Sequence, residues 1–96
     1  MVKIPKIVVS VELDSDENSY YSRELILGFI PSKGMILSLM IGGESERIII
    51  TEVRYEEQEL RIVLEGKTEY KEMNDDVLRE MRLRFESDKK WKLEVL

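Results

Sequence analysis

The sequence predicts a mainly β protein, a small antiparallel β-barrel or roll with one short helix and a C-terminal β-hairpin. Three observations support this fold class. Isoleucine and valine, whose branched side chains pack well on a pleated sheet, are frequent, and alanine is absent. Apolar and polar residues alternate along several segments with the period of two that a half-buried strand requires. Runs rich in glycine, proline, aspartate and serine separate these segments and indicate turns.

The length of 96 residues predicts a single domain that spans residues 1–96. A chain of this size buries roughly 60–68% of the surface that its unfolded form exposes, which is enough for one core. A hydrophobic content of 43% argues against intrinsic disorder. No apolar run approaches the roughly 20 residues needed to span a bilayer, so we expect a cytoplasmic protein without a membrane partner.

Alternation predicts five strands, each with one buried face. The inward-facing residues are Ile7, Val9, Val11 and Leu13 in the first strand, Tyr21, Leu25, Leu27 and Phe29 in the second, Met35, Leu37, Leu39 and Ile41 in the third, Ile49, Thr51, Val53 and Tyr55 in the fourth, and Leu60, Ile62 and Leu64 in the fifth. Antiparallel pairing that sets apolar residues opposite one another places Ile41 opposite Arg47 and Tyr55 opposite Leu60. Strands two to five then form a four-strand meander over about residues 20–65.

Residues 74–96 are expected to form a helix of one to two turns followed by a terminal hairpin. Asn74 is typical of a helix N-cap, and two aspartates follow it where the helix dipole favours anions. Apolar residues four apart would also allow a helix that continues to Phe85, but Leu83 would then point away from its apolar face. Strict alternation favours the hairpin, with Phe85 opposite Trp91. The alternating residues are Met81, Leu83 and Phe85, and then Trp91, Leu93 and Val95.

The middle of the chain carries a family resemblance. The run from Leu25 to Gly34 (LILGFIPSKG), followed by alternating leucines and the run from Ile48 to Val53 (IIITEV), resembles a group of small bacterial and phage-associated proteins with SH3-like β-barrels. In that group an Ile-Pro-x-x-Gly corner joins two strands. The resemblance covers about residues 20–65, implies an SH3-like barrel, and assigns no function. The segment 81–96 lies outside the pattern.

The residues that are missing argue against an enzyme. The chain has no cysteine and no histidine, which excludes disulfides, thiolate metal sites, and Ser-His or Cys-His nucleophiles. No phosphate-binding glycine loop or nucleophile elbow is present. Asp14 to Asn18 (DSDEN) matches the start of a calcium loop, but Leu25 occupies the position of the bidentate glutamate, so a solvated loop is expected. The residues indicate no catalytic site, metal or cofactor.

The most informative residues for function are apolar side chains on the side of strands two to four that faces away from the predicted core. A small one-sided sheet normally carries polar residues there, and a contiguous exposed apolar area usually marks an interface. Either the C-terminal segment covers this side or another chain does. The sequence therefore predicts a protein-binding module, with a homodimer as one form of it. The apolar residues on this side are Ile26, Ile30, Ile36, Met40, Ile48 and Ile50, and the candidate interface residues among them are Ile26, Ile36, Met40, Ile48 and Ile50.

A basic stretch offers an alternative function. Residues 79–92 carry six basic and three acidic residues, a local charge of +3, and they include Trp91. Basic residues beside an aromatic ring are typical of surfaces that bind single-stranded nucleic acid. The candidate basic patch is Arg82, Arg84, Lys90 and Lys92. Nucleic acid is nevertheless not the expected partner, because the net charge is −5 and the hairpin would pair Arg82 with Glu94 and Glu86 with Lys90.

Overall fold

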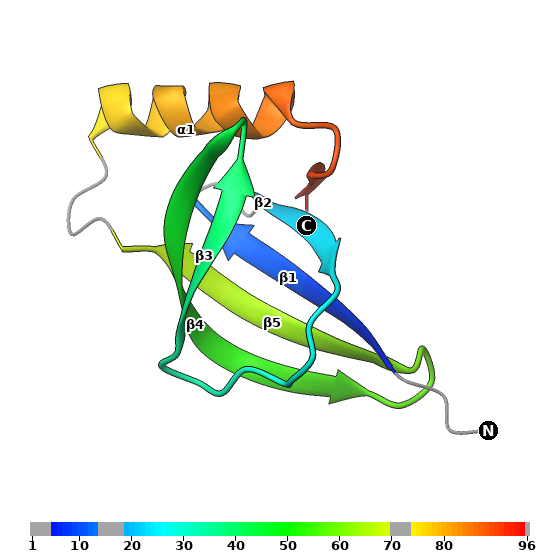
Figure 1. Cartoon of the computed structure of the whole chain (residues 1–96). Coiled ribbons are helices and arrows are strands. Elements are labelled where there is room, and N and C mark those ends of the chain that lie inside the picture. Colours follow the sequence, from blue (N-terminus) through cyan, green and yellow to red (C-terminus); the bar gives the residue numbers. More distant parts are fainter. Residues whose placement is uncertain (1–4, 14–18, 70–73, 96) are drawn as a thin grey trace.

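The computed structural model describes residues 5–13, 19–69 and 74–95 and has a mainly β fold with one helix (Figure 1). Six strands form one curled sheet, a half-barrel, and the helix α1 lies across its upper end (Figure 1). The predicted fold class is confirmed at this level. The elements are β1 (Lys6–Glu12), β2 (Ser19–Leu25), β3 (Ile36–Ile41), β4 (Glu44–Glu56), β5 (Arg61–Thr68), α1 (Asp75–Ser87) and β6 (Lys92–Val95).

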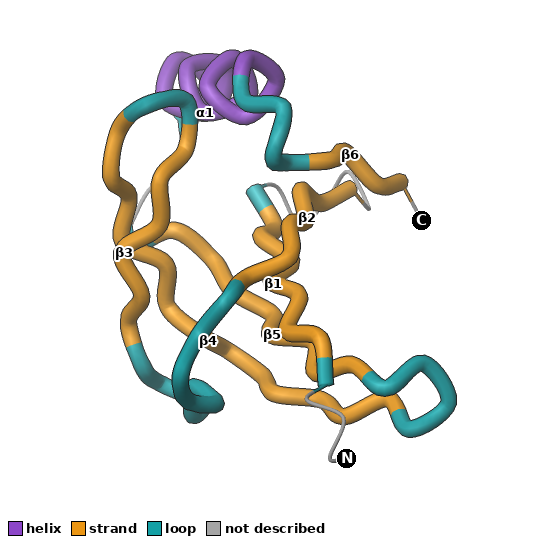
Figure 2. Tube along the Cα trace, turned by 45° about the vertical axis from the view of Figure 1, so that its right-hand side comes forward, coloured by secondary structure: helices purple, strands orange, loops and turns teal. Residues whose placement is uncertain are grey.

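The strand order is β3-β4-β5-β1-β2-β6, which corrects the predicted four-strand meander. β1 lies between β5 and β2, parallel to β5 and antiparallel to β2. Only β3, β4 and β5 form a meander, because β2 pairs with β1 and β6 and not with β3. The chain between β2 and β3 instead crosses from one side of the half-barrel to the other (Figure 2).

One contiguous core fills the inside of the curl. Within β1 and β3 the predicted inward faces are confirmed, since their alternate apolar residues are buried. Leu13, Met35 and Leu60 were also expected to face inward, but each lies just outside its strand: Leu13 is only partly buried, and Met35 and Leu60 are exposed. β1 contributes to the core along its whole length because it has a strand on each side and α1 above. The buried apolar residues of this core are Ile7, Val9, Val11, Tyr21, Leu25, Leu37, Leu39, Ile41, Ile48, Ile50, Ile62, Leu64, Met81, Phe85 and Trp91.

The turn between β3 and β4 reverses the predicted face of β4. Gly42 and Gly43 have φ values of 61° and 86°, so they form a two-residue turn of the primed kind that suits a hairpin. Ile41 therefore pairs with Glu44 and not, as predicted, with Arg47. A shift by three residues exchanges the two faces of a strand. Ile48 and Ile50 are consequently fully buried.

A β-bulge then restores the predicted side for the second half of β4. The pairing with β5 shifts between Ile50 and Glu52, which leaves Thr51 as the extra residue. Val53 pairs with Leu64 on the core side of the sheet, and the predicted pairing of Tyr55 with Leu60 is wrong by two residues because Tyr55 pairs with Ile62. This part of β4 extends beyond the core, so both of its apolar side chains are exposed.

The prediction of a terminal hairpin is wrong, because the chain from Asp75 to Ser87 is one continuous helix. Its predicted N-cap is confirmed: the Oδ1 of Asn74 accepts a hydrogen bond of 2.9 Å from the backbone N–H of Val77. The helical period wins over the alternation because α1 buries Met81 and Phe85, four residues apart, against the sheet. Leu83 remains 60% exposed on the outer side.

Candidate interaction surfaces

Three aromatic rings attach α1 to the sheet. The Tyr21 ring on β2 stacks on the Phe85 ring at 4.4 Å between centroids, and the Trp91 ring meets Phe85 edge-on at 4.9 Å. The indole N–H of Trp91 donates to the backbone carbonyl of Met40 at 3.1 Å, which reaches across to β3. The predicted contact between Phe85 and Trp91 therefore exists, but it joins a helix to the segment after it. The inner side of the sheet is thus covered by the chain's own C-terminal part.

The five candidate interface residues fall into a buried group and an exposed group. Ile48 and Ile50 belong to the core, which corrects their assignment to an exposed face. Ile26, Ile36 and Met40 are exposed, by 99%, 39% and 49% respectively. The correction follows from the two-residue turn after β3, which turned the first half of β4 inward. An interface can therefore use only the part of the predicted set that lies outside β4.

Among the described residues, five exposed large apolar side chains lie within residues 26–36, from the end of β2 to the first residue of β3. β2 ends at Leu25, four residues earlier than the alternation predicted, and Phe29 is half exposed instead of buried. We call the exposed large apolar residues of this stretch the β2–β3 apolar segment. Its members are Ile26, Phe29, Ile30, Met35 and Ile36.

The β2–β3 apolar segment is held in place from both ends. Leu27 packs against the core and Pro31 is fully buried, and these two residues, which alternate with exposed ones along the chain, fix the position of the connection. At the far end, the backbone N–H of Gly34 donates to the carbonyl of Ile50 at 2.7 Å. The N–H of Ile50 in turn donates to the carbonyl of Met35 at 2.9 Å. Ile30 was expected on the side facing away from the core and is exposed, whereas sequence reasoning missed Phe29 as a surface residue because it continued β2 through it with its side chain inward.

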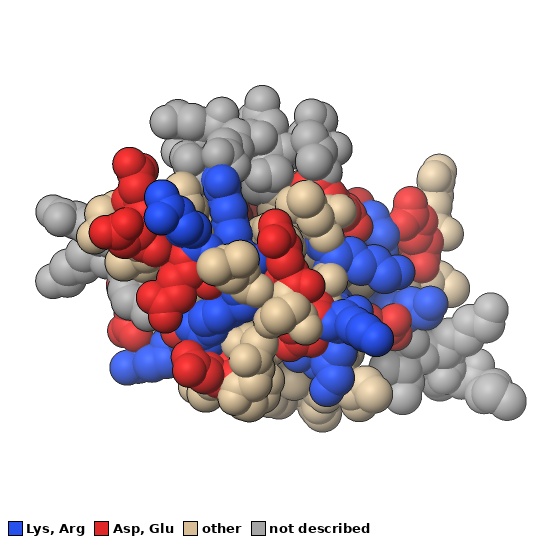
Figure 3. Space-filling view, turned by 90° about the horizontal axis from the view of Figure 1, so that it is seen from above, with Lys and Arg blue, Asp and Glu red and all other residues tan. Residues whose placement is uncertain are grey.

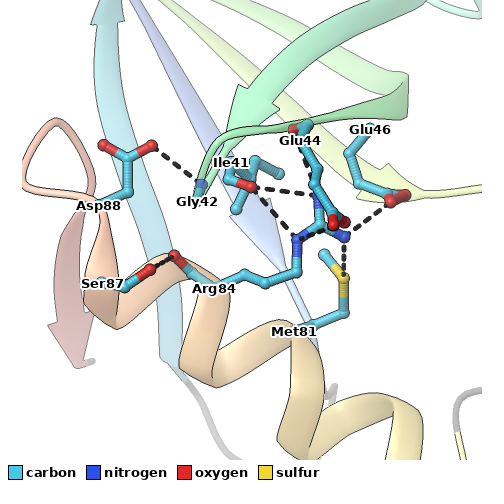
Figure 4. A network of polar contacts seen from close by, with 8 residues as sticks. All are labelled: Ile41, Gly42, Glu44, Glu46, Met81, Arg84, Ser87 and Asp88. Atoms are coloured by element: carbon cyan, nitrogen blue, oxygen red, sulfur yellow. Dashed lines mark hydrogen bonds and ion pairs between the residues drawn. The ribbon is translucent and has the colours of Figure 1, made fainter.

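The four predicted basic residues do not form one patch. Arg84 is largely buried between α1 and the β3–β4 turn, where its guanidinium donates to the backbone carbonyl of Ile41 and to the Glu46 carboxylate, the latter at 2.9 Å (Figure 4). Arg82 lies in α1, so the cross-strand geometry expected for it with Glu94 does not exist.

Seen from above, basic and acidic side chains intermix over the described surface (Figure 3). Lys90 and Lys92 are exposed beyond the end of the helix. The predicted pairing of Glu86 with Lys90 also depended on the hairpin and is lost with it, because Glu86 lies in α1. The described basic residues therefore give no continuous track of positive charge on this face, which is what a nucleic-acid backbone requires.

Arg84 and Gly42 hold the β3–β4 turn against α1. A Cβ added to Gly42 would lie 2.8 Å from the backbone oxygen of Arg84, so only glycine allows this approach. The Asp88 carboxylate accepts hydrogen bonds from the backbone N–H groups of Lys90 and Gly42, at 3.0 and 3.1 Å (Figure 4 shows the second). The bond from Lys90, followed by the bond from Gly42, lowers the pKa of Asp88.

We expect Asp88→Ala to destabilise the protein by about 0.5–1.5 kcal/mol at neutral pH, as for the loss of an ordinary hydrogen-bonded partner. Because the folded-state pKa of Asp88 is lowered, its contribution is present above the unfolded-state pKa. It is lost as the pH falls through the folded value. Urea unfolding of both proteins at neutral pH and near pH ~2 measures this. A difference between them that persists in acid would contradict the assignment.

Glu94 fastens β6 to β2. Its carboxylate accepts a hydrogen bond of 3.1 Å from the Ser22 hydroxyl. A second hydrogen bond, with the Tyr20 hydroxyl, raises the pKa of Tyr20. In residues 5–13, 19–69 and 74–95, no three carboxylates lie close enough together to hold a metal ion, and no helix is long and apolar enough to cross a membrane. The acidic run from Asp14 to Asn18 lies outside these described residues.

No protein-family model, curated protein or solved structure is similar to this chain at a meaningful level. The resemblance of residues 20–65 to SH3-like barrels therefore stays a prediction. Any proposal for function has to be built from the surfaces described above.

Proposed function

We propose that this protein is a non-enzymatic protein-interaction module that self-associates through the β2–β3 apolar segment. The observation that carries the proposal is that five large apolar side chains within residues 26–36 are exposed. Ile26, Phe29 and Ile30 are each more than half exposed. Burying such a side chain completely contributes about 1.5–3 kcal/mol, so leaving this cluster in water forgoes a large stabilisation. Exposed apolar side chains that gather on a surface usually mark a protein contact, and these five lie close together in the sequence.

The anchoring of the segment also supports a binding role. A surface that is already ordered loses less conformational entropy when it binds. The buried Pro31 and the hydrogen bonds between Gly34, Met35 and Ile50 order this segment before any partner arrives. Elsewhere, the ladder of β4 and β5 presents charges that are paired within the molecule, including Arg47 with Glu69 at 3.1 Å. Such paired charges give little net attraction to a charged ligand.

The double variant Phe29→Ser, Ile30→Ser is expected to weaken self-association by about 10–100-fold, because it removes apolar area from the centre of the segment. Sedimentation equilibrium over a wide range of protein concentrations measures the dissociation constant. Lys33→Ser is the matched control, since Lys33 is exposed in the same connection but is not apolar. Its dissociation constant should equal that of the unmodified protein.

Salt separates an apolar contact from an electrostatic one. Exposed charges are screened by added salt, whereas apolar burial is not weakened by it. The proposal fails if the unmodified protein is monomeric at the highest concentration reached. It also fails if the double variant associates as tightly as the control, or if high salt abolishes association of the unmodified protein and of the control.

A further inference from the structure

β3 is an edge strand. It pairs with β4 on one side only, and it ends the sheet. Edge strands expose unpaired backbone N–H and C=O groups that can template pairing with another chain. In proteins such edges are usually blunted with charged side chains or proline. The six residues of β3, ILSLMI, contain neither.

The hydrogen-bond pattern shows which backbone groups point outward. The carbonyl of Met35 accepts from Ile50 on β4, and Ile41 pairs with Glu44 across the two-residue turn. The odd-numbered residues of β3 therefore bond to β4, and the backbone groups of Ile36, Ser38 and Met40 face the open edge. Among the described residues, Trp91 supplies the single hydrogen bond on that side, to the carbonyl of Met40.

The side chains of β3 suit pairing with a second copy of the same strand. An antiparallel pair centred on Ser38 places Ile36 of one copy opposite Met40 of the other, and Ser38 opposite Ser38. Apolar residues then face apolar residues on the outer face, which stabilises a ladder. The Ile36 and Met40 side chains are both exposed; the Met40 carbonyl keeps its bond from Trp91, so the two backbone bonds between the Ser38 residues at the axis carry the ladder.

Charge does not oppose this pairing, although the protein has a net charge of −5. The strand itself is uncharged, and the nearest charged neighbour on the same face is Arg47, which lies opposite Ser38 on β4. In the paired form the two copies of Arg47 would be three strand spacings apart, roughly 14 Å. That exceeds the Debye length of about 8 Å at physiological salt. Arg47 is also neutralised by Glu69.

The opposite edge of the sheet differs in a way that favours a closed dimer. β6 has four residues, of which Lys92 and Glu94 are charged. A contact between β3 of one copy and β6 of the next would be head-to-tail and could continue without limit. The charges on β6 disfavour it, whereas pairing of β3 with β3 is two-fold and ends with two copies.

We propose that two copies of this chain pair antiparallel through their β3 edges, with the two-fold axis at Ser38, so that two half-barrel sheets become one continuous sheet. This proposal rests on the proposed self-association and adds its geometry. The β2–β3 apolar segment leads directly into β3 and ends at Ile36. Its last two members, Met35 and Ile36, therefore lie next to and within the paired strand.

The test uses Ser38→Pro, which removes a backbone N–H that points outward. Proline is tolerated on an edge strand when its missing N–H faces solvent, so the ladder with β4 is retained. In the dimer, two ladder bonds at the axis are lost, each worth about a fivefold factor, and the ring fills the space of the facing strand. Sedimentation equilibrium should show a dissociation constant at least ~30-fold higher. Ser38→Thr, which keeps the N–H, should stay as dimeric as the unmodified protein.

Amide hydrogen exchange of the unmodified protein tests the same geometry without a variant. At concentrations above the dissociation constant, the amides of Ile36, Ser38 and Met40 should exchange at least ~10-fold more slowly than below it, because a closed ladder bond blocks exchange. The amides of Leu37 and Leu39, bonded to β4, are the internal control and should be protected in both states.

The outcomes distinguish this geometry from self-association as such. A dimer that Phe29→Ser, Ile30→Ser dissociates, but in which Ser38→Pro has no effect and the three edge amides exchange freely, would overturn the β3 pairing and leave the proposed function standing. A protein that is monomeric at every concentration would overturn both. Loss of the dimer in Ser38→Pro with retention in Ser38→Thr, or edge protection that depends on concentration, would support the paired edge.

Discussion

Replacing Phe85 by alanine is expected to lower the free energy of unfolding by about 3–5 kcal/mol. Phe85 is 1% exposed and lies between the rings of Tyr21 and Trp91, so its removal leaves a cavity and ends both ring contacts. The same ring attaches α1 to the half-barrel. Urea unfolding followed by far-UV circular dichroism measures the change, and the urea dependence shows whether the native state stays compact.

Leu83→Ala is the matched control for Phe85→Ala. Both residues lie on α1, but Leu83 faces solvent, so its truncation should change the free energy of unfolding by less than about 0.5 kcal/mol. The comparison also separates the helix from the hairpin that alternation predicted. In a hairpin both side chains would point inward, and both truncations would be costly. Equal losses for the two variants would contradict the helix.

Replacing Ile48 by lysine is expected to unfold the protein at ambient temperature. Ile48 is fully buried, and it packs so closely over Gly66 that a Cβ placed there would lie 2.6 Å from the Ile48 Cγ2. A lysine at this position would bury an amine without a partner, at a cost of about 4 kcal/mol or more. That is a large part of the roughly 5–15 kcal/mol that stabilises a typical domain. One-dimensional proton NMR would show loss of the dispersed methyl signals.

The variant Ile49→Lys tests independently which face of β4 is buried. Ile49 is half buried on the outer face, opposite Ile36, so a lysine there can extend its amine into water. This variant should remain folded and lose about 1–2 kcal/mol. The register predicted from the sequence would give the opposite result, with Ile49 inside and Ile48 outside. A folded Ile48→Lys and an unfolded Ile49→Lys would therefore contradict the observed register.

The local features of this chain were determined by its sequence. The alternation in β1 and β3 located both strands and their buried faces, because a strand places successive side chains on opposite sides whatever it pairs with. Asn74 located the start of α1, because a cap depends only on the next three residues. The missing cysteine and histidine limited the available chemistry in the same direct way.

The candidate surface was predicted in part. Ile26, Ile30, Ile36 and Met40 were expected outside the core and are exposed, but Phe29 was missed and two core residues were included. The error came from assigning the wrong alternate residues of β4 to the buried face. That assignment depends on whether the turn after β3 has two residues or five. Gly42 and Gly43 are compatible with either length when only the sequence is read. The turn is decided by the packing of Gly42 against Arg84, two residues that are far apart in the chain.

Tertiary structure alone decided the remaining features. The parallel pairing of β1 with β5 joins segments about fifty residues apart, and no local pattern specifies such a partner. Residues 81–86 satisfy both a period of two and a spacing of four, so their own sequence is compatible with a strand and with a helix. The inside of the half-barrel selects the helix, because a helix buries Met81 and Phe85 together against Tyr21 and Trp91 while Leu83 stays in water. Periodicity identifies which side chains can share a face, but only the three-dimensional core determines which face is buried.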